Sequence, residues 1–185
     1  NTVYVGSHDG SVYALSAADG TEKWTYQTGS SVESSPAVVN GTVYVGSHDG
    51  SVYALAADDG TKQWSFQTGL SVVSSPAVVD STVYIGGWDD NVHALSAADG
   101  SELWSYETGE FIDSSPAVAD GTVYVGSRDR TVYALSTADG SEQWSYETDG
   151  QVISSPTVVD STVYVGSNDE TVYALSAEDG TERWT

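Results

Sequence analysis

A period of 40 residues, a valine- and tyrosine-rich composition and regularly spaced turn signals predict an all-β fold, a β-propeller of four-stranded antiparallel blades. The period runs through the 185 residues without insertions and aligns Thr2, Thr42, Thr82, Thr122 and Thr162. Turn residues recur about every 8–12 positions, which is typical of consecutive short strands. Repeats of this length and composition are characteristic of propeller blades. We therefore divide the single domain 1–185 into repeats 1–40, 41–80, 81–120, 121–160 and the partial repeat 161–185.

Each repeat is expected to contain four strands in order. In one copy these are Ser74–Val79, Thr82–Gly87, Asn91–Leu95 and Glu102–Thr108. The same spacing predicts complete blades at 34–68, 74–108, 114–148 and 154–185. Residues 1–28 supply only the second, third and fourth strands of another blade. The sequence therefore predicts four complete blades and a three-stranded partial blade, and we expect the chain to be part of a longer protein or to be completed by another chain.

The turns between strands have recognisable chemistry. Asn40-Gly41 and Asp120-Gly121 separate first and second strands, and such pairs favour the type I′ hairpin because it needs two positive φ angles. Each expected first strand also contains a proline, which cannot donate to a sheet ladder and therefore indicates an edge strand facing the central channel. These prolines are Pro36, Pro76, Pro116 and Pro156.

The remaining strands differ in their apolar pattern. The second and third strands are apolar at successive positions, which predicts burial on both faces between stacked blades. The fourth strand alternates, with Trp24 and Tyr26 on one side, and is expected to be the half-exposed outer strand. One tryptophan holds the same place in every copy, at Trp24, Trp64, Trp104, Trp144 and Trp184.

The composition limits the function. Asp and Glu number 27 against 5 Lys and Arg, a formal charge of −22. Nucleic acids and anionic membranes need a basic surface, so neither is an expected partner. Dispersed carboxylates repel one another unless salt screens them, so we expect the protein of a salt-loving organism. No cysteine is present, and no apolar stretch is long enough for membrane insertion.

The segment "YALSAADGTEKW" (Tyr13–Trp24) and its copies resemble the repeat of the pyrroloquinoline-quinone-type β-propeller family. The family signature is an alanine, then a glycine, three further residues and a tryptophan, and the Gly-x-x-x-Trp part is intact five times, as in Gly20–Trp24. The aspartate often found after Ala-Leu is replaced by Ser16, Ala56, Ser96, Ser136 or Ser176. The resemblance implies that each tryptophan docks against the neighbouring blade, and that complete rings have eight blades.

The copies differ mainly in two kinds of loop, which a propeller places on one face. These are the turn between the second and third strands and the loop between blades; we call the face that they form the variable face. Its large apolar and cationic side chains are the candidate partner-binding residues: Trp88, Phe111, Leu70, Arg128 and Arg130. Tryptophan, phenylalanine and arginine close together resemble the anchors of protein interfaces.

The chemistry of catalysis is missing from the sequence. His8 and His48 lie at turn tips of neighbouring blades, and no two histidines have metal-ligand spacing. His93 replaces a tyrosine in a strand, and we expect it to be a packing substitution. The aspartate shared by all second-to-third turns is expected to close its turn. As an alternative, the pair Asp89 and Asp90, or the pair Asp169 and Glu170, could form a weak surface cation site. We expect no catalytic, cofactor or structural metal residues, since quinone dehydrogenases carry a cysteine pair, a calcium site and a catalytic aspartate on insertions that this chain lacks.

These observations favour a non-catalytic scaffold that binds protein partners outside the cell or on its surface. Some members of the pyrroloquinoline-quinone-type family, which the chain resembles, serve as assembly platforms of this kind. Two alternatives remain. The chain could be a fragment of a quinone-dependent oxidoreductase, or it could associate with itself through open blade ends to build a larger ring.

Overall fold

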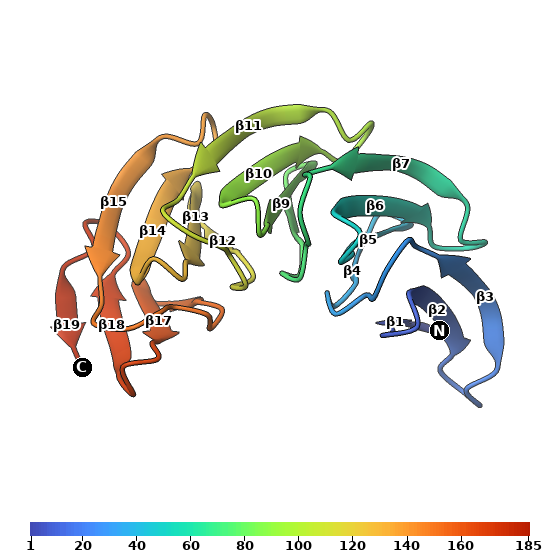
Figure 1. Cartoon of the computed structure of the whole chain (residues 1–185), viewed down its shortest axis with the longest axis horizontal. Coiled ribbons are helices and arrows are strands. Elements are labelled where there is room, and N and C mark those ends of the chain that lie inside the picture. The colour runs from blue at the N-terminus through green and yellow to red at the C-terminus, as the bar shows by residue number, and fades with distance from the viewer.

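A computed structural model describes all of residues 1–185 and confirms the all-β propeller architecture. Five antiparallel sheets follow one another along an arc, with the two chain ends at opposite ends of it (Figure 1). In each complete sheet the strand order is the sequence order, from an inner strand to an outer one. None of the elements is a helix that could cross a membrane.

We number the sheets as blades 1 to 5, and the strands have the following bounds. Blade 1 has β1 (Thr2–Gly6), β2 (Ser11–Ser16) and β3 (Glu22–Gln27). Blade 2 has β4 (Ala37–Val39), β5 (Thr42–Gly46), β6 (Ser51–Ala56) and β7 (Lys62–Gln67). Blade 3 has β8 (Ala77–Val79), β9 (Thr82–Gly86), β10 (Asn91–Ser96) and β11 (Glu102–Glu107). Blade 4 has β12 (Ala117–Ala119), β13 (Thr122–Gly126), β14 (Thr131–Ser136) and β15 (Glu142–Glu147). Blade 5 has β16 (Thr157–Val159), β17 (Thr162–Gly166), β18 (Val172–Ser176) and β19 (Glu182–Trp184).

The innermost strands are shorter than expected, and the prolines lie outside them. The sequence suggested a strand over Ser74–Val79, whereas β8 begins only at Ala77. The Ser-Ser-Pro segment before it bonds in another way: Ser74 Oγ donates to the Gly86 carbonyl within the blade, and Ser75 N donates to Ser115 Oγ of the next blade. Placing Pro76 inside an edge strand was therefore wrong, because this segment links neighbouring blades instead of extending the ladder.

The hairpins between first and second strands have the expected geometry. Asn40 and Gly41 have φ angles of 49° and 78°, as a type I′ turn requires. In two copies a serine takes the glycine position, and Ser81 and Ser161 are held at φ 63° and 57°. The turn geometry thus persists where the side chain disfavours it, since the flanking ladder and the blade packing determine it.

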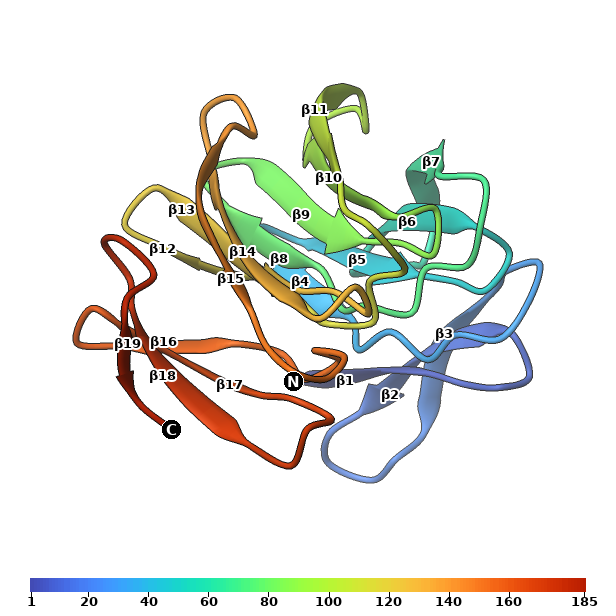
Figure 2. The same ribbon diagram turned by 60° about the vertical axis from the view of Figure 1, so that its left-hand side comes forward.

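Consecutive blades stack face to face, and each stacking interface, here called a joint, has its own apolar core. Joint 1, between blades 1 and 2, packs Val12 and Trp24 of blade 1 against Val43, Val45 and Leu55 of blade 2. Strands β5 and β13 are buried at every position, whereas β3 has one buried residue, Trp24, and one half-buried residue, Tyr26, between exposed ones. The core is therefore a row of similar layers between the blades. Figure 2 shows the stacked blades from a second direction.

The repeated tryptophan contributes the same two contacts at all four joints. Its indole Nε1 donates to a carbonyl of the following blade, as Trp64 does to Ala97 at 3.0 Å. Its ring also covers a glycine of that blade: a Cβ on Gly100 would lie 2.5 Å from Trp64 Cε3, and φ there is +73°. Only glycine satisfies both the positive φ and the close approach of the ring.

Both ends of the arc expose faces that are buried at the joints. Trp184 is 50% exposed, against 7–8% for Trp24, Trp64 and Trp144. At the other end Val3 is 47% exposed, and nothing lies within 4 Å of a Cβ built on Gly20. Blade 5 thus presents an uncovered tryptophan, and blade 1 presents an uncovered glycine of the kind that such a tryptophan covers.

Candidate functional site

The variable face is held together by backbone hydrogen bonds. Each loop between blades lies between the second-to-third turns of two neighbouring blades and bonds to both. At joint 1, Val32 N donates to the Ser7 carbonyl and His48 N donates to the Ser31 carbonyl, both at 2.9 Å. The same pair of bonds recurs along the arc, with Trp88 N on the Ser71 carbonyl and Arg128 N on the Phe111 carbonyl. Side chains of three successive segments therefore meet at each joint.

The aspartate shared by these turns closes them, as the sequence indicated. Asp49 Oδ1 accepts from Ser51 N at 2.9 Å, and its Oδ2 accepts from the Tyr53 hydroxyl at 2.7 Å. Burial raises the pKa of this carboxyl, but its hydrogen bonds from Tyr53, Gly29 and Ser51 outweigh burial and lower the pKa overall. In the two candidate cation pairs, Asp89 Oδ2 contacts His93 Nε2 at 2.9 Å and Asp169 Oδ2 accepts from the Tyr173 hydroxyl at 2.8 Å, so each pair has one carboxylate oxygen already engaged.

Three of the five candidate partner-binding residues form one cluster at joint 3. The rings of Trp88 and Phe111 stack at 5.5 Å between centroids and an interplanar angle of 8°. The Arg128 guanidinium carbon lies 5.5 Å from the Trp88 ring centroid and 5.7 Å from that of Phe111. Both distances fall within the range of cation–π attraction. We call these residues, with Asp113, the aromatic clasp.

Asp113 orients the aromatic clasp. Its Oδ2 accepts from Arg128 Nε at 2.5 Å, and its Oδ1 accepts from Arg128 Nη2 at 3.1 Å and from Trp88 Nε1 at 3.0 Å. The hydrogen bond to Asp113 raises the pKa of Arg128 above its usual value. One carboxylate thus fixes both a guanidinium and an indole, and it holds the stacked rings in place.

The other two candidates lie outside this cluster. Leu70 is 53% exposed in the loop before blade 3. Arg130 is exposed and pairs with Glu147 of its own blade at 2.9 Å. The sequence placed all five residues on one face, but only Trp88, Phe111 and Arg128 are brought into contact with one another.

His93 has a different role from the packing substitution that the sequence suggested. Its ring is buried in β10, with Nε2 2.9 Å from Asp89 Oδ2 and Nδ1 2.8 Å from Glu102 Oε1. Burial lowers the pKa of His93, but the hydrogen bonds to both carboxylates outweigh burial and raise it overall. A histidine with carboxylates at both nitrogens is favoured in its doubly protonated form, so an ion triad replaces the usual Tyr–Asp pair.

The remaining histidines meet at joint 1. Glu33 Oε1 lies 3.7 Å from His8 Nδ1 and 3.1 Å from His48 Nε2. The imidazole of His48 in turn packs its ring at 84° against Trp88, at 5.6 Å between centroids. Glu33 occupies at joint 1 the place that Asp113 has at joint 3.

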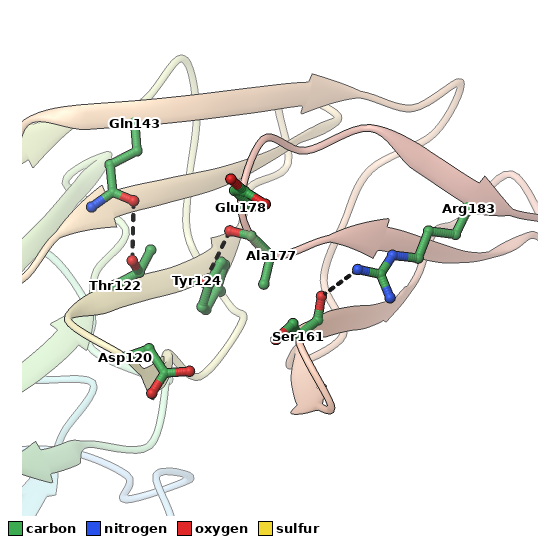
Figure 3. A pocket seen from close by; sticks show the side chains of 8 residues that line it. All are labelled: Asp120, Thr122, Tyr124, Gln143, Ser161, Ala177, Glu178 and Arg183. Atoms are coloured by element: carbon green, nitrogen blue, oxygen red, sulfur yellow. Dashed lines mark hydrogen bonds between the residues drawn. The ribbon is translucent and has the colours of Figure 1, made fainter.

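The opposite face has a polar hollow of about 360 Å³ between blades 4 and 5 (Figure 3). Its charged groups are Asp120, Glu178 and Arg183. Arg183 donates to the Ser161 carbonyl at 2.9 Å, and so serves its own blade. Thr122 donates to Gln143 within blade 4, and the Tyr124 hydroxyl donates to the Ala177 carbonyl of blade 5 (Figure 3). These contacts do not form a pairing of nucleophile and base.

Sequence reasoning overlooked the carboxylates of the loops between blades. Glu33 and Asp113 are separated by 80 residues, two full periods, and each lies between the turns of two blades. The 40-residue period could have identified them. A residue at the loop position of Glu33 or Asp113 must face the second-to-third turn of the blade before it and that of the blade after it. Applied to Glu33, this rule brings His8 and His48 together without any short spacing in the sequence.

Comparisons with known proteins agree with the fold. The family model described as "Beta-alanine-activating enzyme, beta-propeller" matches residues 1–185. No curated protein sequence is similar enough to this chain to count as a relative.

Among solved structures, BamB from Moraxella catarrhalis superposes with a TM-score of 0.88 at 24% identity, over 100% of this chain and 60% of that one. The computationally designed protein Ika8 matches with a TM-score of 0.86 at 22% identity, over 95% and 55%. The quinohemoprotein alcohol dehydrogenase ADHIIG from Pseudomonas putida HK5 matches with a TM-score of 0.81 at 19% identity, over 98% of this chain and 40% of that one. The chain thus spans at most 60% of these proteins, and the likeness shows the propeller fold.

Proposed function

Because the chain belongs to the β-propeller family of the beta-alanine-activating enzyme, we propose that it is a non-catalytic propeller scaffold that binds a protein partner through the aromatic clasp. We place it outside the cell, or on its surface, in a salt-loving organism. The observation that carries the proposal is the contact of Trp88, Phe111 and Arg128 on one face.

The chemistry of the aromatic clasp suits a binding anchor. Tryptophan and arginine dominate the residues whose truncation weakens protein interfaces most. Fixing such side chains in advance lowers the conformational entropy lost on binding. Asp113 fixes both side chains through hydrogen bonds. A partner would then find an aromatic surface with one cation, in a chain that is otherwise strongly acidic.

The test is affinity capture with matched variants in high salt. Wild type, Trp88→Ala with Phe111→Ala, and Leu103→Ala are immobilised, and the captured proteins are identified and then titrated singly. Leu103 is the control because it is 56% exposed but lies in β11, an outer strand. We expect a partner that binds wild type and Leu103→Ala and is lost from the double variant. Equal binding by the double variant would show that this cluster is not the interface.

Self-association is a second candidate, and the exposed end faces support it. At each joint the tryptophan of one blade bonds to a carbonyl next to the glycine-containing loop of the next; Trp144, for example, donates to Ala177 at 3.0 Å. Trp184 and the blade 1 loop containing Ala17 and Gly20 are the uncovered halves of the same contact. Joining them between copies is a head-to-tail contact, which builds a ring if the rotation closes and a filament if it does not.

Sedimentation velocity over a wide concentration range tests self-association. We expect association in wild type that Trp184→Ala abolishes and Trp88→Ala leaves unchanged. A wild-type chain that stays monomeric at every concentration would eliminate this candidate.

The oxidoreductase alternative has its own test. Addition of pyrroloquinoline quinone with Ca²⁺ should then shift the quinone absorbance and raise the melting temperature. We expect neither change, and either of them would contradict the scaffold proposal.

A further inference from the structure

The geometry points to a binding site for a divalent transition-metal ion, of the zinc and copper class, at joint 1, formed by His8, His48 and Glu33. The three side chains come from three separate segments: the turn of blade 1, the turn of blade 2 and the loop between the blades. Two imidazoles with one carboxylate form a ligand set suited to these ions.

The backbone holds the two turns against this loop. Ser31 Oγ donates to the His8 carbonyl at 3.1 Å, and His48 N donates to the Ser31 carbonyl at 2.9 Å. Glu33 lies two residues beyond Ser31, so its carboxylate is placed between the two turn tips. The convergence of the side chains therefore depends on the blade packing and not on the chance position of long side chains.

The contact between His48 and Glu33 does not have hydrogen-bond geometry. Although His48 Nε2 is 3.1 Å from Glu33 Oε1, this nitrogen atom is buried and has no hydrogen-bond partner. Two ligand atoms bound to one tetrahedral ion at about 2.0–2.1 Å lie roughly 3.3 Å apart. The separation of the two atoms fits ligation of a shared ion, which would also satisfy the buried nitrogen.

His8 must move to complete the set. Its Nδ1 is 3.7 Å from the same Glu33 oxygen, and its side chain is 82% exposed. As they stand, the three groups do not surround one point. Rotation of the exposed His8 side chain brings a second imidazole nitrogen to the ion, and water fills the open position. The bound ion then links blade 1 to blade 2 across joint 1.

The other joints show why the site is confined to joint 1. At the place of Glu33, joints 2 and 4 have Val73 and Ile153, which do not bind metals. Joint 3 has Asp113, but its carboxylate is occupied by Trp88 and Arg128. Joint 1 alone combines a carboxylate with histidines at both adjoining turns.

Calorimetric titration with Zn²⁺ and Cu²⁺, in molar KCl with excess Mg²⁺, tests the site. We expect one ion per chain, bound more tightly for Cu²⁺ than for Zn²⁺, since that is the usual order for imidazole sites. Mg²⁺ prefers oxygen ligands and should not compete. Loss of even an outer-shell partner weakens metal binding by about 10–100-fold, so His48→Asn and Glu33→Val should each weaken it by at least about tenfold. Both replacements occur naturally at the same place in other copies, as Asn168 and Val73, so these variants should fold.

A second measurement locates the ion. Trp88 packs against His48, so Cu²⁺ should quench the fluorescence of Trp88, and Trp88→Phe should bind Cu²⁺ with this quenching removed. The control His93→Tyr, which removes the third histidine, should bind as wild type does. Unchanged Zn²⁺ affinity in His8→Asn and His48→Asn, displacement of the ion by Mg²⁺, or no saturable binding at all would each overturn the proposal.

Discussion

At the scale of single residues, the copies act as controls for one another, and a departure from the repeat is informative only through its neighbours. His93 shows this clearly. Its replacement of a tyrosine was visible in the sequence, but its partner Glu102 belongs to the next strand. Glu102 is paired with Leu95, and only the register of β10 and β11 brings its side chain within reach of His93. The sequence therefore predicted a buried residue and could not predict a buried ion triad.

The triad makes stability depend on pH in a defined direction. The pKa of His93 is raised in the folded chain, so its stabilisation is complete below the pKa of unfolded histidine, about 6.5, and is lost as the pH rises through the folded value. Above that value, the carboxyl groups of Asp89 and Glu102 also lose the cation between them. We expect the free energy of unfolding to decrease from about pH 6.5 upward.

Urea unfolding of wild type and His93→Tyr between pH 6 and pH 9, at constant salt, measures this dependence. Tyrosine at this place should pair with Asp89 as Tyr53 pairs with Asp49, so the variant should fold. His8 and His48 are present in both proteins, so the difference between the two curves isolates His93. Parallel curves would show that the triad is not charged in the folded state.

At the scale of the structural elements, the sequence predicted the strands that stack between blades better than the strands near the centre. The second strand was expected at Thr82–Gly87 and forms Thr82–Gly86, because its continuous apolar pattern coincides with its burial. The first strand has few residues, and its Ser-Ser-Pro segment bonds to a serine 40 residues away. No local pattern distinguishes such a bond between blades from a short ladder.

The contribution of the tryptophan–glycine contact to the free energy of unfolding can be measured, because one of the repeated glycines, Gly20, has no tryptophan covering it. Gly100 and Gly20 both have φ +73°, but only Gly100 faces a tryptophan. Alanine at Gly20 should reduce the free energy of unfolding by the cost of a left-handed residue, about 1–2 kcal/mol. At Gly100 the new Cβ would also displace Trp64, which should add roughly 1–3 kcal/mol.

Denaturant titration of Gly20→Ala and Gly100→Ala gives both losses, and their difference is the contribution of the tryptophan contact. The shared φ makes the backbone strain equal in the two variants. Equal losses would mean that the indole moves aside freely and that joint 2 does not depend on this contact.

At the scale of the whole molecule, the repeat predicted the architecture because each blade needs only its neighbours. Every joint has the same layer of valine, leucine and tryptophan, so one well-predicted interface predicts them all. The variable face could not be predicted in the same way. The aromatic clasp depends on Asp113, and the meeting of His8 with His48 depends on Glu33, where loops of unequal sequence meet.

The charge of the chain belongs to this scale as well, because almost none of it is neutralised by contacts. Of 27 acidic residues, only Asp113 and Glu147 form ion pairs with arginine, while Lys23, Lys62 and Arg183 bond to uncharged oxygens. Mutual repulsion of the remaining carboxylates therefore opposes the compact state. The Debye length falls from about 30 Å at 0.01 M salt to about 10 Å at 0.1 M and 3 Å at 1 M, so added salt removes this repulsion.

We therefore expect the melting temperature to rise strongly with KCl, and most steeply at low concentration, where screening changes most. Salting-out, by contrast, would grow steadily at molar concentrations and would be stronger in sulfate than in chloride. Comparison of KCl with potassium sulfate at equal ionic strength separates the two effects: an electrostatic origin gives nearly the same curve in both salts. Full stability in dilute buffer would show that repulsion between the carboxylates does not limit the fold, and that the acidic composition is no sign of a high-salt environment.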